Sequence, residues 1–149
     1  MHRYSLYREG VSRMDDSGQP RCQILIVEDD AMIGTLERDL LTQAGYEPLW
    51  VTQGQAALDL LHAAAAVPDL IILDLMLPDM PGQDLYAALE ADERWRTIPV
   101  LIISALPAAA AHTTALTRAT YLPKPFDPPH LLALVRTTLA DCTRGREPT

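Results

Sequence analysis

The stretch that decides the fold of this chain is residues 70–82, which read LIILDLMLPDMPG. Its first four residues are all large aliphatic side chains, a pattern typical of a short strand buried on both faces of a sheet. Asp74 ends this strand, and the prolines and glycine that follow stop regular structure. Because open parallel sheets place ligand sites at the carboxyl ends of their strands, Asp74 is a candidate site residue. An isolated aspartate here would more simply cap a turn, so the residues at the other strand ends decide whether Asp74 belongs to a functional site.

Apolar runs and helically spaced apolar residues alternate along the rest of the chain. The expected strands cover residues 22–27, 47–52, 70–73, 99–103 and 119–122. The expected helices run from Asp30, as N-cap, to Gly45, then over 54–64, 82–91 and 108–117, with a last one capped by Asp127 and carrying Pro128 in its first turn. Five strands alternating with five helices predict an open parallel sheet covered on both faces. We expect one domain over residues 21–141, a mobile extension over 1–20 and a polar tail over 142–149.

Composition excludes several classes of protein. The 149 residues are 48% hydrophobic, enough for one core, and the net charge of −8 argues against direct binding to DNA or anionic lipid. No run is long enough to cross a membrane, and the N-terminus lacks the apolar segment of a secretory signal. Cys22 and Cys142 lie far apart without metal-ligand spacing, so we expect reduced thiols in a cytoplasmic protein.

The predicted topology collects polar residues at one edge of the sheet. Right-handed crossovers place the carboxyl ends of all parallel strands on the same side. That edge receives Glu28, Asp29 and Asp30 from the first strand, Asp74 from the third, Ser104 from the fourth and Lys124 after the fifth. Lys124 is the only lysine among twelve basic residues. This group of side chains, rather than any one of them, carries the functional prediction.

Converging carboxylates repel one another, so in a folded protein they need either a cation or raised pKa values. Asp29 and Asp74 would form an oxygen-only site, which suits Mg²⁺ better than zinc because no histidine or cysteine falls near these strand ends. Mg²⁺ beside Asp74 would favour in-line attack of the carboxylate on a phosphoryl group. Lys124 would balance the phosphoryl charge and the Ser104 hydroxyl would donate a hydrogen bond, while the Tyr121 ring could fill the space left when Ser104 moves.

Four separated motifs now permit a comparison with a known family. Residues 24–30, residues 74–82, Ser104-Ala105 and Lys124-Pro125-Phe126 resemble, in order and spacing, the receiver domain of two-component response regulators. The resemblance extends from residue 23 to about residue 140. It implies a doubly wound (βα)5, flavodoxin-like three-layer sandwich, CheY-like and without a further domain.

The resemblance also implies residue roles. Asp74 is expected to be the phosphoacceptor, and the Mg²⁺ ligands are expected to be Asp29, Asp74, the backbone carbonyl of Met76 and, through water, Glu28. Ser104 matches the switch hydroxyl, Lys124 the phosphate-contacting lysine and Tyr121 the switch aromatic. The Lys124-Pro125 bond would be cis.

The implied function is signalling and not enzymatic. We expect a stand-alone response regulator, phosphorylated by a sensor histidine kinase or a histidine phosphotransfer protein, that acts on a downstream protein target. A homodimer that forms on phosphorylation is a further option. The segment over 105–120 departs from the family pattern, which puts the fourth helix and the usual output surface in question.

Other readings are weaker. A non-phosphorylated receiver-like scaffold is the alternative, although such proteins commonly lose the pocket residues that this chain keeps. A phosphohydrolase would need a proton-transferring residue at the position of Met76. A dinucleotide site would need a glycine-rich loop where residues 28–30 are acidic. Asp79 reads as a turn residue, and Trp50 and Trp95 read as packing or loop residues.

Overall fold

The computed structural model describes residues 16–18, 21–64, 67–106 and 119–140. Its strands are β1 Gln23–Val27, β2 Glu47–Val51, β3 Leu70–Leu73, β4 Val100–Ser104 and β5 Thr120–Pro123, and its helices are α2 Ala31–Gln43, α3 Gly54–Ala63, α4 Gly82–Ala91 and α6 Pro128–Thr138. The strands form one parallel sheet in the order β2-β1-β3-β4-β5. The predicted doubly wound parallel sheet is therefore confirmed. The expected helix over 108–117 lies outside the described residues, as do most of the extension and the tail.

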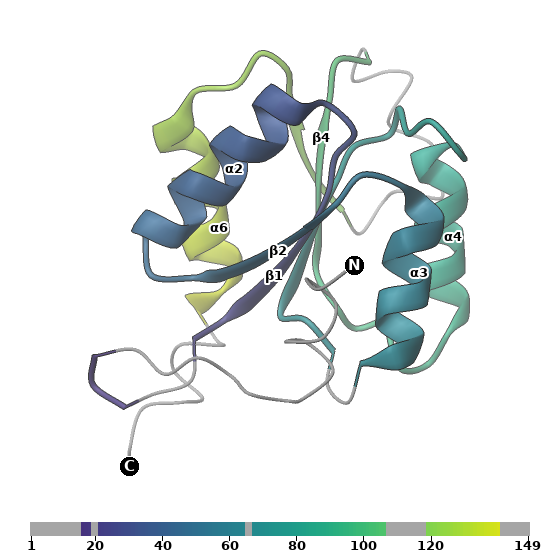
Figure 1. Ribbon diagram of the computed structural model, residues 1–149, viewed down its shortest axis with the longest axis horizontal. Coiled ribbons are helices and arrows are strands. Elements are labelled where there is room, and N and C mark those ends of the chain that lie inside the picture. The colour runs from purple at the N-terminus through teal and green to yellow at the C-terminus, as the bar shows by residue number, and fades with distance from the viewer. Residues whose placement is uncertain (1–15, 19–20, 65–66, 107–118, 141–149) are drawn as a thin grey trace.

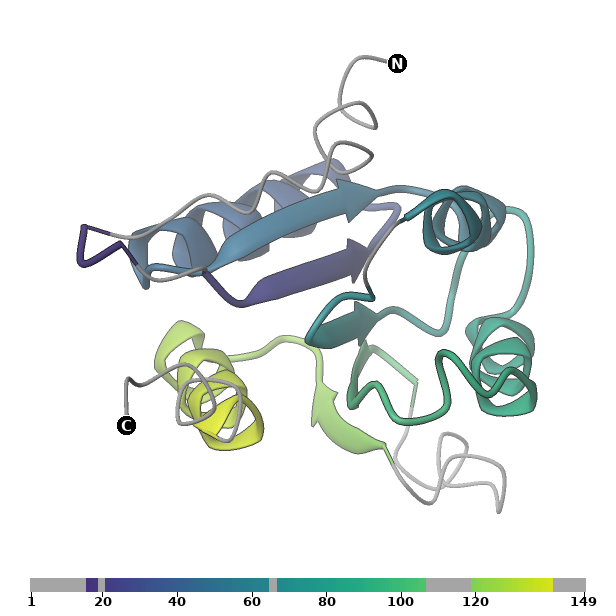
Figure 2. The same cartoon turned by 90° about the horizontal axis from the view of Figure 1, so that it is seen from below.

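The sheet separates two hydrophobic cores. In Figure 1, α2 and α6 cover one face of the sheet, and α3 and α4 cover the other. Alternate strand residues point to opposite faces, so Leu25 and Val27 belong to the core under α3 and α4, whereas Ile24 and Ile26 belong to the core under α2 and α6. All four residues of β3 are buried, as the aliphatic run predicted. This central position fixes the end of β3 in the middle of the sheet edge (Figure 2).

Helix α2 is turned differently from the expectation. Met32, Ile33, Leu36, Leu40 and Leu41 recur at helical spacing in the sequence, but Met32 is 84% exposed, Leu36 is 41% exposed, and Leu41 alone of the five is buried. The residues that the helix buries are Gly34, Glu37 and Leu41. A glycine and a carboxylate thus occupy the face that packs against the sheet. Gly34 on this face lies against the Trp50 ring, as described below.

The helix ends follow the expected capping in part. The Asp30 carboxylate accepts hydrogen bonds from the backbone N–H groups of Met32 at 2.9 Å and Ile33 at 3.1 Å, which confirms it as the N-cap of α2. Gly45 follows that helix with φ of +94°, a conformation that favours glycine. Asp127 occupies the N-cap position of α6, but its side chain makes no capping hydrogen bond.

Cys22 contradicts the expectation of a reduced thiol. It is disulfide-bonded, and the part of the chain that the structure describes contains no free cysteine. The second cysteine, Cys142, lies outside the described residues. The cysteines therefore give no argument for a reducing compartment. Within the described ranges, no helix combines the length and the apolar content needed to cross a membrane.

Candidate phosphoacceptor and metal site

The carboxyl ends of three strands bring acidic and basic side chains together. Glu28 and Asp29 follow β1, Asp74 follows β3 and Lys124 follows β5. Backbone hydrogen bonds of the sheet continue just past the strand ends. The N–H of Glu28 donates to the Val51 carbonyl at 3.0 Å, and the N–H of Asp74 donates to the Val27 carbonyl at 3.0 Å. These bonds fix the backbone from which the two buried carboxylates project.

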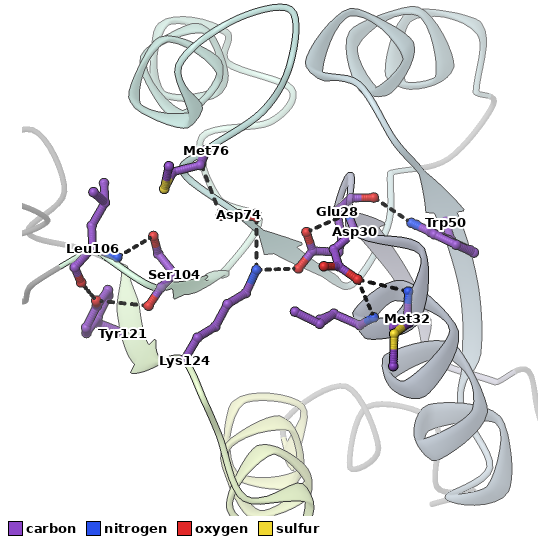
Figure 3. A network of polar contacts seen from close by, with 11 residues as sticks. Glu28, Asp30, Met32, Trp50, Asp74, Met76, Ser104, Leu106, Tyr121 and Lys124 are labelled. Atoms are coloured by element: carbon purple, nitrogen blue, oxygen red, sulfur yellow. Dashed lines mark hydrogen bonds and ion pairs between the residues drawn. The ribbon is translucent and has the colours of Figure 1, made fainter.

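Lys124 joins two of these carboxylates. Its ammonium lies 2.7 Å from Glu28 Oε1 and 3.0 Å from Asp74 Oδ2 (Figure 3). Both acids are buried, and the lysine side chain is only 13% exposed. A buried ion pair of this kind is strongly destabilised when one partner is removed, because the other charge stays behind in a poorly solvated place. The only lysine of the chain is therefore committed to this site.

The environment shifts the ionisation of these groups. Burial, reinforced by Asp74, raises the pKa of Glu28 to about 7, while the Lys124 ammonium opposes that shift. Burial lowers the pKa of Lys124, but its contacts with Glu28 and Asp74 outweigh burial and leave the pKa raised. Three carboxyl groups share this edge of the sheet with one lysine, and a divalent cation there would relieve their mutual repulsion.

The residues present fit a hard divalent cation. Carboxylate oxygens of Glu28, Asp29 and Asp74 all lie within 4.8 Å of one another, and they are the only such group in the part of the chain that the structure describes. All three donors are oxygens, the ligands that Mg²⁺ prefers. Asp29 is exposed and so leaves an open side for water or a phosphoryl oxygen. The Met76 N–H donates to Asp74 Oδ1 at 3.0 Å, which places its backbone beside the site; ligation by its carbonyl stays a prediction.

Ser104, the last residue of β4, and Tyr121, within β5, form a second polar network (Figure 3). Ser104 is completely buried, and its hydroxyl oxygen accepts a hydrogen bond from the N–H of Leu106 at 3.2 Å. The Tyr121 hydroxyl donates to the carbonyl of Leu106 and lies 3.2 Å from that of Ser104. The two predicted switch residues therefore meet at the first residues of the segment after β4. The Lys124-Pro125 bond is cis, as expected.

The loop between β3 and α4 is fastened to a neighbouring helix, which the sequence analysis missed. Asp79 is more than a turn residue, because its carboxylate accepts from the N–H groups of Gly54 at 2.9 Å and Gln55 at 2.8 Å. It thereby caps α3, whose own N-cap residue makes no side-chain bond, and the Gln55 N–H lowers the pKa of Asp79. A Cβ on Gly82 would lie 2.6 Å from the Asp74 carbonyl oxygen, so only glycine permits this close return of the chain.

Two further residues near the site were not identified from the sequence. Glu37 is 1% exposed, and neither of its carboxylate oxygens has a hydrogen-bond partner. Burial, and secondly the charge of Glu28, raise its pKa to about 8. Helical spacing from Leu41 was the available signal, since residues four apart share a face. Trp50, expected to be only a packing residue, donates its indole N–H to the Glu28 carbonyl at 2.8 Å.

Comparisons with known proteins agree with this geometry. The family model of the response regulator receiver domain matches residues 24–136. The polar-differentiation response regulator DivK of Brucella ovis is 32% identical over 120 residues, which cover 79% of this chain and 96% of DivK. The transcriptional regulatory protein YbdJ of Bacillus subtilis is 36% identical over 118 residues, or 78% of this chain and 50% of YbdJ. The chain spans about half the length of YbdJ and of BaeR from Escherichia coli.

Solved structures show the same fold. The chemotaxis response regulator CheY4 of Vibrio cholerae superposes with a TM-score of 0.72 at 27% identity, over 80% of this chain and 99% of CheY4. A response regulator structure from Chloroflexus aurantiacus has a TM-score of 0.72 at 30% identity, over 80% of this chain and 98% of the other. The flavodoxin-like, CheY-like architecture is confirmed.

Proposed function

The chain belongs to the response regulator receiver domain family, and on that premise we propose that it accepts a phosphoryl group on Asp74 in a Mg²⁺-dependent reaction. Receiver domains are signalling modules that interact with histidine kinases or phosphotransfer proteins and with downstream targets. The proposed donor is such a protein, and the proposed output is a changed protein-binding surface. The family supports a cytoplasmic location.

The observation that carries the proposal is the arrangement of Asp74, Lys124 and the acidic pair. Asp74 is buried at a strand end between a cation and two further carboxylates. A structural ion pair would need one acid for one base, whereas this site gathers three acids around one lysine. Asp29, Asp74, the Met76 carbonyl and, through water, Glu28 would hold Mg²⁺, which would supply positive charge to the phosphoryl oxygens.

The side chains of this site account for the proposed reaction. A carboxylate oxygen of Asp74 attacks phosphorus, the bond from phosphorus to the donor breaks, and the donor leaves with that electron pair. With acetyl phosphate the products are the aspartyl phosphate and acetate. Lys124 exchanges its contact with Asp74 Oδ2 for a phosphoryl oxygen, and the Ser104 hydroxyl donates a hydrogen bond to another. Because Ser104 and Tyr121 both contact Leu106, movement of Ser104 would be transmitted to the segment after β4.

Acetyl phosphate tests the proposal directly. The protein, Asp74→Asn and the control Asp39→Asn are incubated with acetyl phosphate and Mg²⁺, and intact masses are measured. Asp39 lies on α2 with a side chain that is 57% exposed, so its loss changes the net charge equally without touching the site. We expect one phosphoryl adduct in the wild type and in Asp39→Asn, and none in Asp74→Asn or with EDTA. A folded wild type that binds Mg²⁺ but gains no adduct, even from a phosphorylated histidine protein, would favour the scaffold reading.

A further inference from the structure

Trp50 connects three elements around the acidic end of β1. It lies in β2, where it pairs in register with Ile26, and it is partly buried. Its indole N–H reaches the backbone carbonyl of Glu28 (Figure 3). The neighbouring Val51 carbonyl accepts the N–H of the same residue. Both backbone groups of Glu28 are therefore held by consecutive residues of β2.

Gly34 makes this position of the indole possible. A Cβ built on Gly34 would lie 2.3 Å from two carbons of the Trp50 ring and 2.7 Å from its nitrogen. Contacts this short do not occur, so the ring rests directly on the backbone of α2. The Arg38 guanidinium lies 5.7 Å from the centroid of the ring, within the range of a cation–π contact. The large Trp50 ring thus occupies the space that a side chain at position 34 would fill.

Trp50 and Gly34 together hold the peptide that carries the acidic residues. Glu28 and Asp29 are consecutive, so the orientation of the Glu28 carbonyl fixes the plane of the peptide that leads into Asp29. On the other side, Asp30 donates its N–H to Glu28 Oε2 at 3.2 Å and caps α2. The loop is therefore held at both ends, with the exposed carboxylate of Asp29 between them.

We propose that Trp50 is a positioning residue that fixes the Glu28 peptide and thereby sets the affinity of the acidic site for Mg²⁺. This inference rests on the proposed function, because it requires that the acidic site binds Mg²⁺. Groups that hold metal ligands in place commonly change metal affinity by 10–100-fold when they are removed. Trp50 touches the ligand peptide and not the reacting atoms, so it acts on binding geometry.

The test compares two identical substitutions at different places. Trp50→Phe keeps an aromatic ring and removes the indole donor. The matched control is Trp95→Phe, because Trp95 is buried among α3 and α4 residues and contacts His62 and Arg94 instead of the acidic loop. The Mg²⁺ dissociation constant is measured by calorimetry, and stability by urea unfolding without metal. We expect Trp50→Phe to raise the Mg²⁺ dissociation constant roughly tenfold. We expect Trp95→Phe to lower stability and to leave the Mg²⁺ dissociation constant unchanged.

Gly34→Ala provides an independent test. The residue at position 50 is still tryptophan, but the new Cβ would push its indole ring away from α2. We expect it to weaken Mg²⁺ binding in the same way, and the double variant Gly34→Ala/Trp50→Phe to be no worse than the weaker-binding single variant. A spectroscopic readout follows from the count of two tryptophans. In Trp95→Phe the remaining emission comes from Trp50, and we expect it to change on addition of Mg²⁺ along the calorimetric binding curve.

The outcomes separate this inference from the proposed function. If the wild type binds Mg²⁺ and is phosphorylated, but Trp50→Phe binds Mg²⁺ within twofold of it, the positioning role is overturned and the proposed function stands. Additive effects in the double variant would also overturn it, because they would show two separate causes. A wild type that neither binds Mg²⁺ nor accepts phosphate would overturn both.

Discussion

The buried carboxylate of Glu37 makes a specific prediction about stability and pH. Its pKa rises from 4.5 to about 8 in the folded protein, with burial as the main cause. The charges of Glu28 and Asp74 raise it further and Lys124 lowers it, so all three charged groups that act on it belong to the site. A raised folded-state pKa means that the folded protein binds more protons than the unfolded chain between these two values. The free energy of unfolding must therefore fall as the pH rises through that window.

The size of the effect follows from the shift. Each pKa unit corresponds to about 1.4 kcal/mol, so ionising Glu37 costs the folded state about 5 kcal/mol relative to the unfolded chain above pH 8. At pH 7 the cost is about 3 kcal/mol, and below pH 4.5 it vanishes. Since a domain is ordinarily stable by about 5–15 kcal/mol, this one side chain would control a large share of the total.

Glu37→Gln isolates the effect because it keeps the shape of the side chain and removes its ionisation. Urea unfolding followed by circular dichroism would be measured from pH 5 to pH 9 for wild type and variant, and the difference between them plotted against pH. Other titrating groups largely cancel in that difference. We expect the variant to gain about 4 kcal/mol relative to wild type between pH 5 and pH 9. Glu93→Gln, whose side chain is 91% exposed, serves as the control and should give a flat difference. A flat difference for Glu37→Gln, within about 1 kcal/mol, would refute the reasoning.

Three further predictions concern the site and its loop. Met76 offers no hydrogen bond to an attacking water, so hydrolysis of the phosphorylated form should be slow, and a wild-type lifetime of only seconds would contradict this. Met76→Asn offers such a hydrogen bond and should shorten the lifetime by up to roughly tenfold, as followed by intact mass. Asp79→Ala should lower the free energy of unfolding by about 1 kcal/mol in urea, because α3 loses the cap on its first N–H groups, and no change would show that water replaces it. Lys124→Ala should cost about 3 kcal/mol, because Glu28 and Asp74 lose their cation, and saturating Mg²⁺ should recover part of that loss in the same assay; equal stability with and without Mg²⁺ would count against a metal at these carboxylates.

The sequence was informative where a structural rule leaves little freedom. The aliphatic run of β3 has to be buried on both faces, and parallel crossovers have to bring strand ends to one edge. Hence the proximity of Glu28, Asp74 and Lys124 could be predicted without coordinates, and the structure places Lys124 within hydrogen-bonding distance of both acids. The same reasoning set the limits of β3 and α4 correctly.

The errors lie where a contact between distant residues decides the outcome. The apolar spacing of α2 included Met32 and Leu36, whereas the face that is buried carries Gly34, which lies against the Trp50 ring, and Glu37. Apolar periodicity cannot register a partner that lies on another strand. The cap that Asp79 provides to α3 joins two loops 25 residues apart, so turn propensity alone described it incompletely.

The single lysine of this chain has a practical consequence for chemical labelling. Because all other basic side chains in the sequence are arginine or histidine, a reagent that acylates the neutral amine of lysine has one side-chain target of that type. That target is held between Glu28 and Asp74, where acylation requires the ion pairs to open. The rate of acylation at Lys124, compared at one pH between conditions, would therefore report how readily these ion pairs open and release a neutral amine. It needs neither a fluorophore nor an added cysteine.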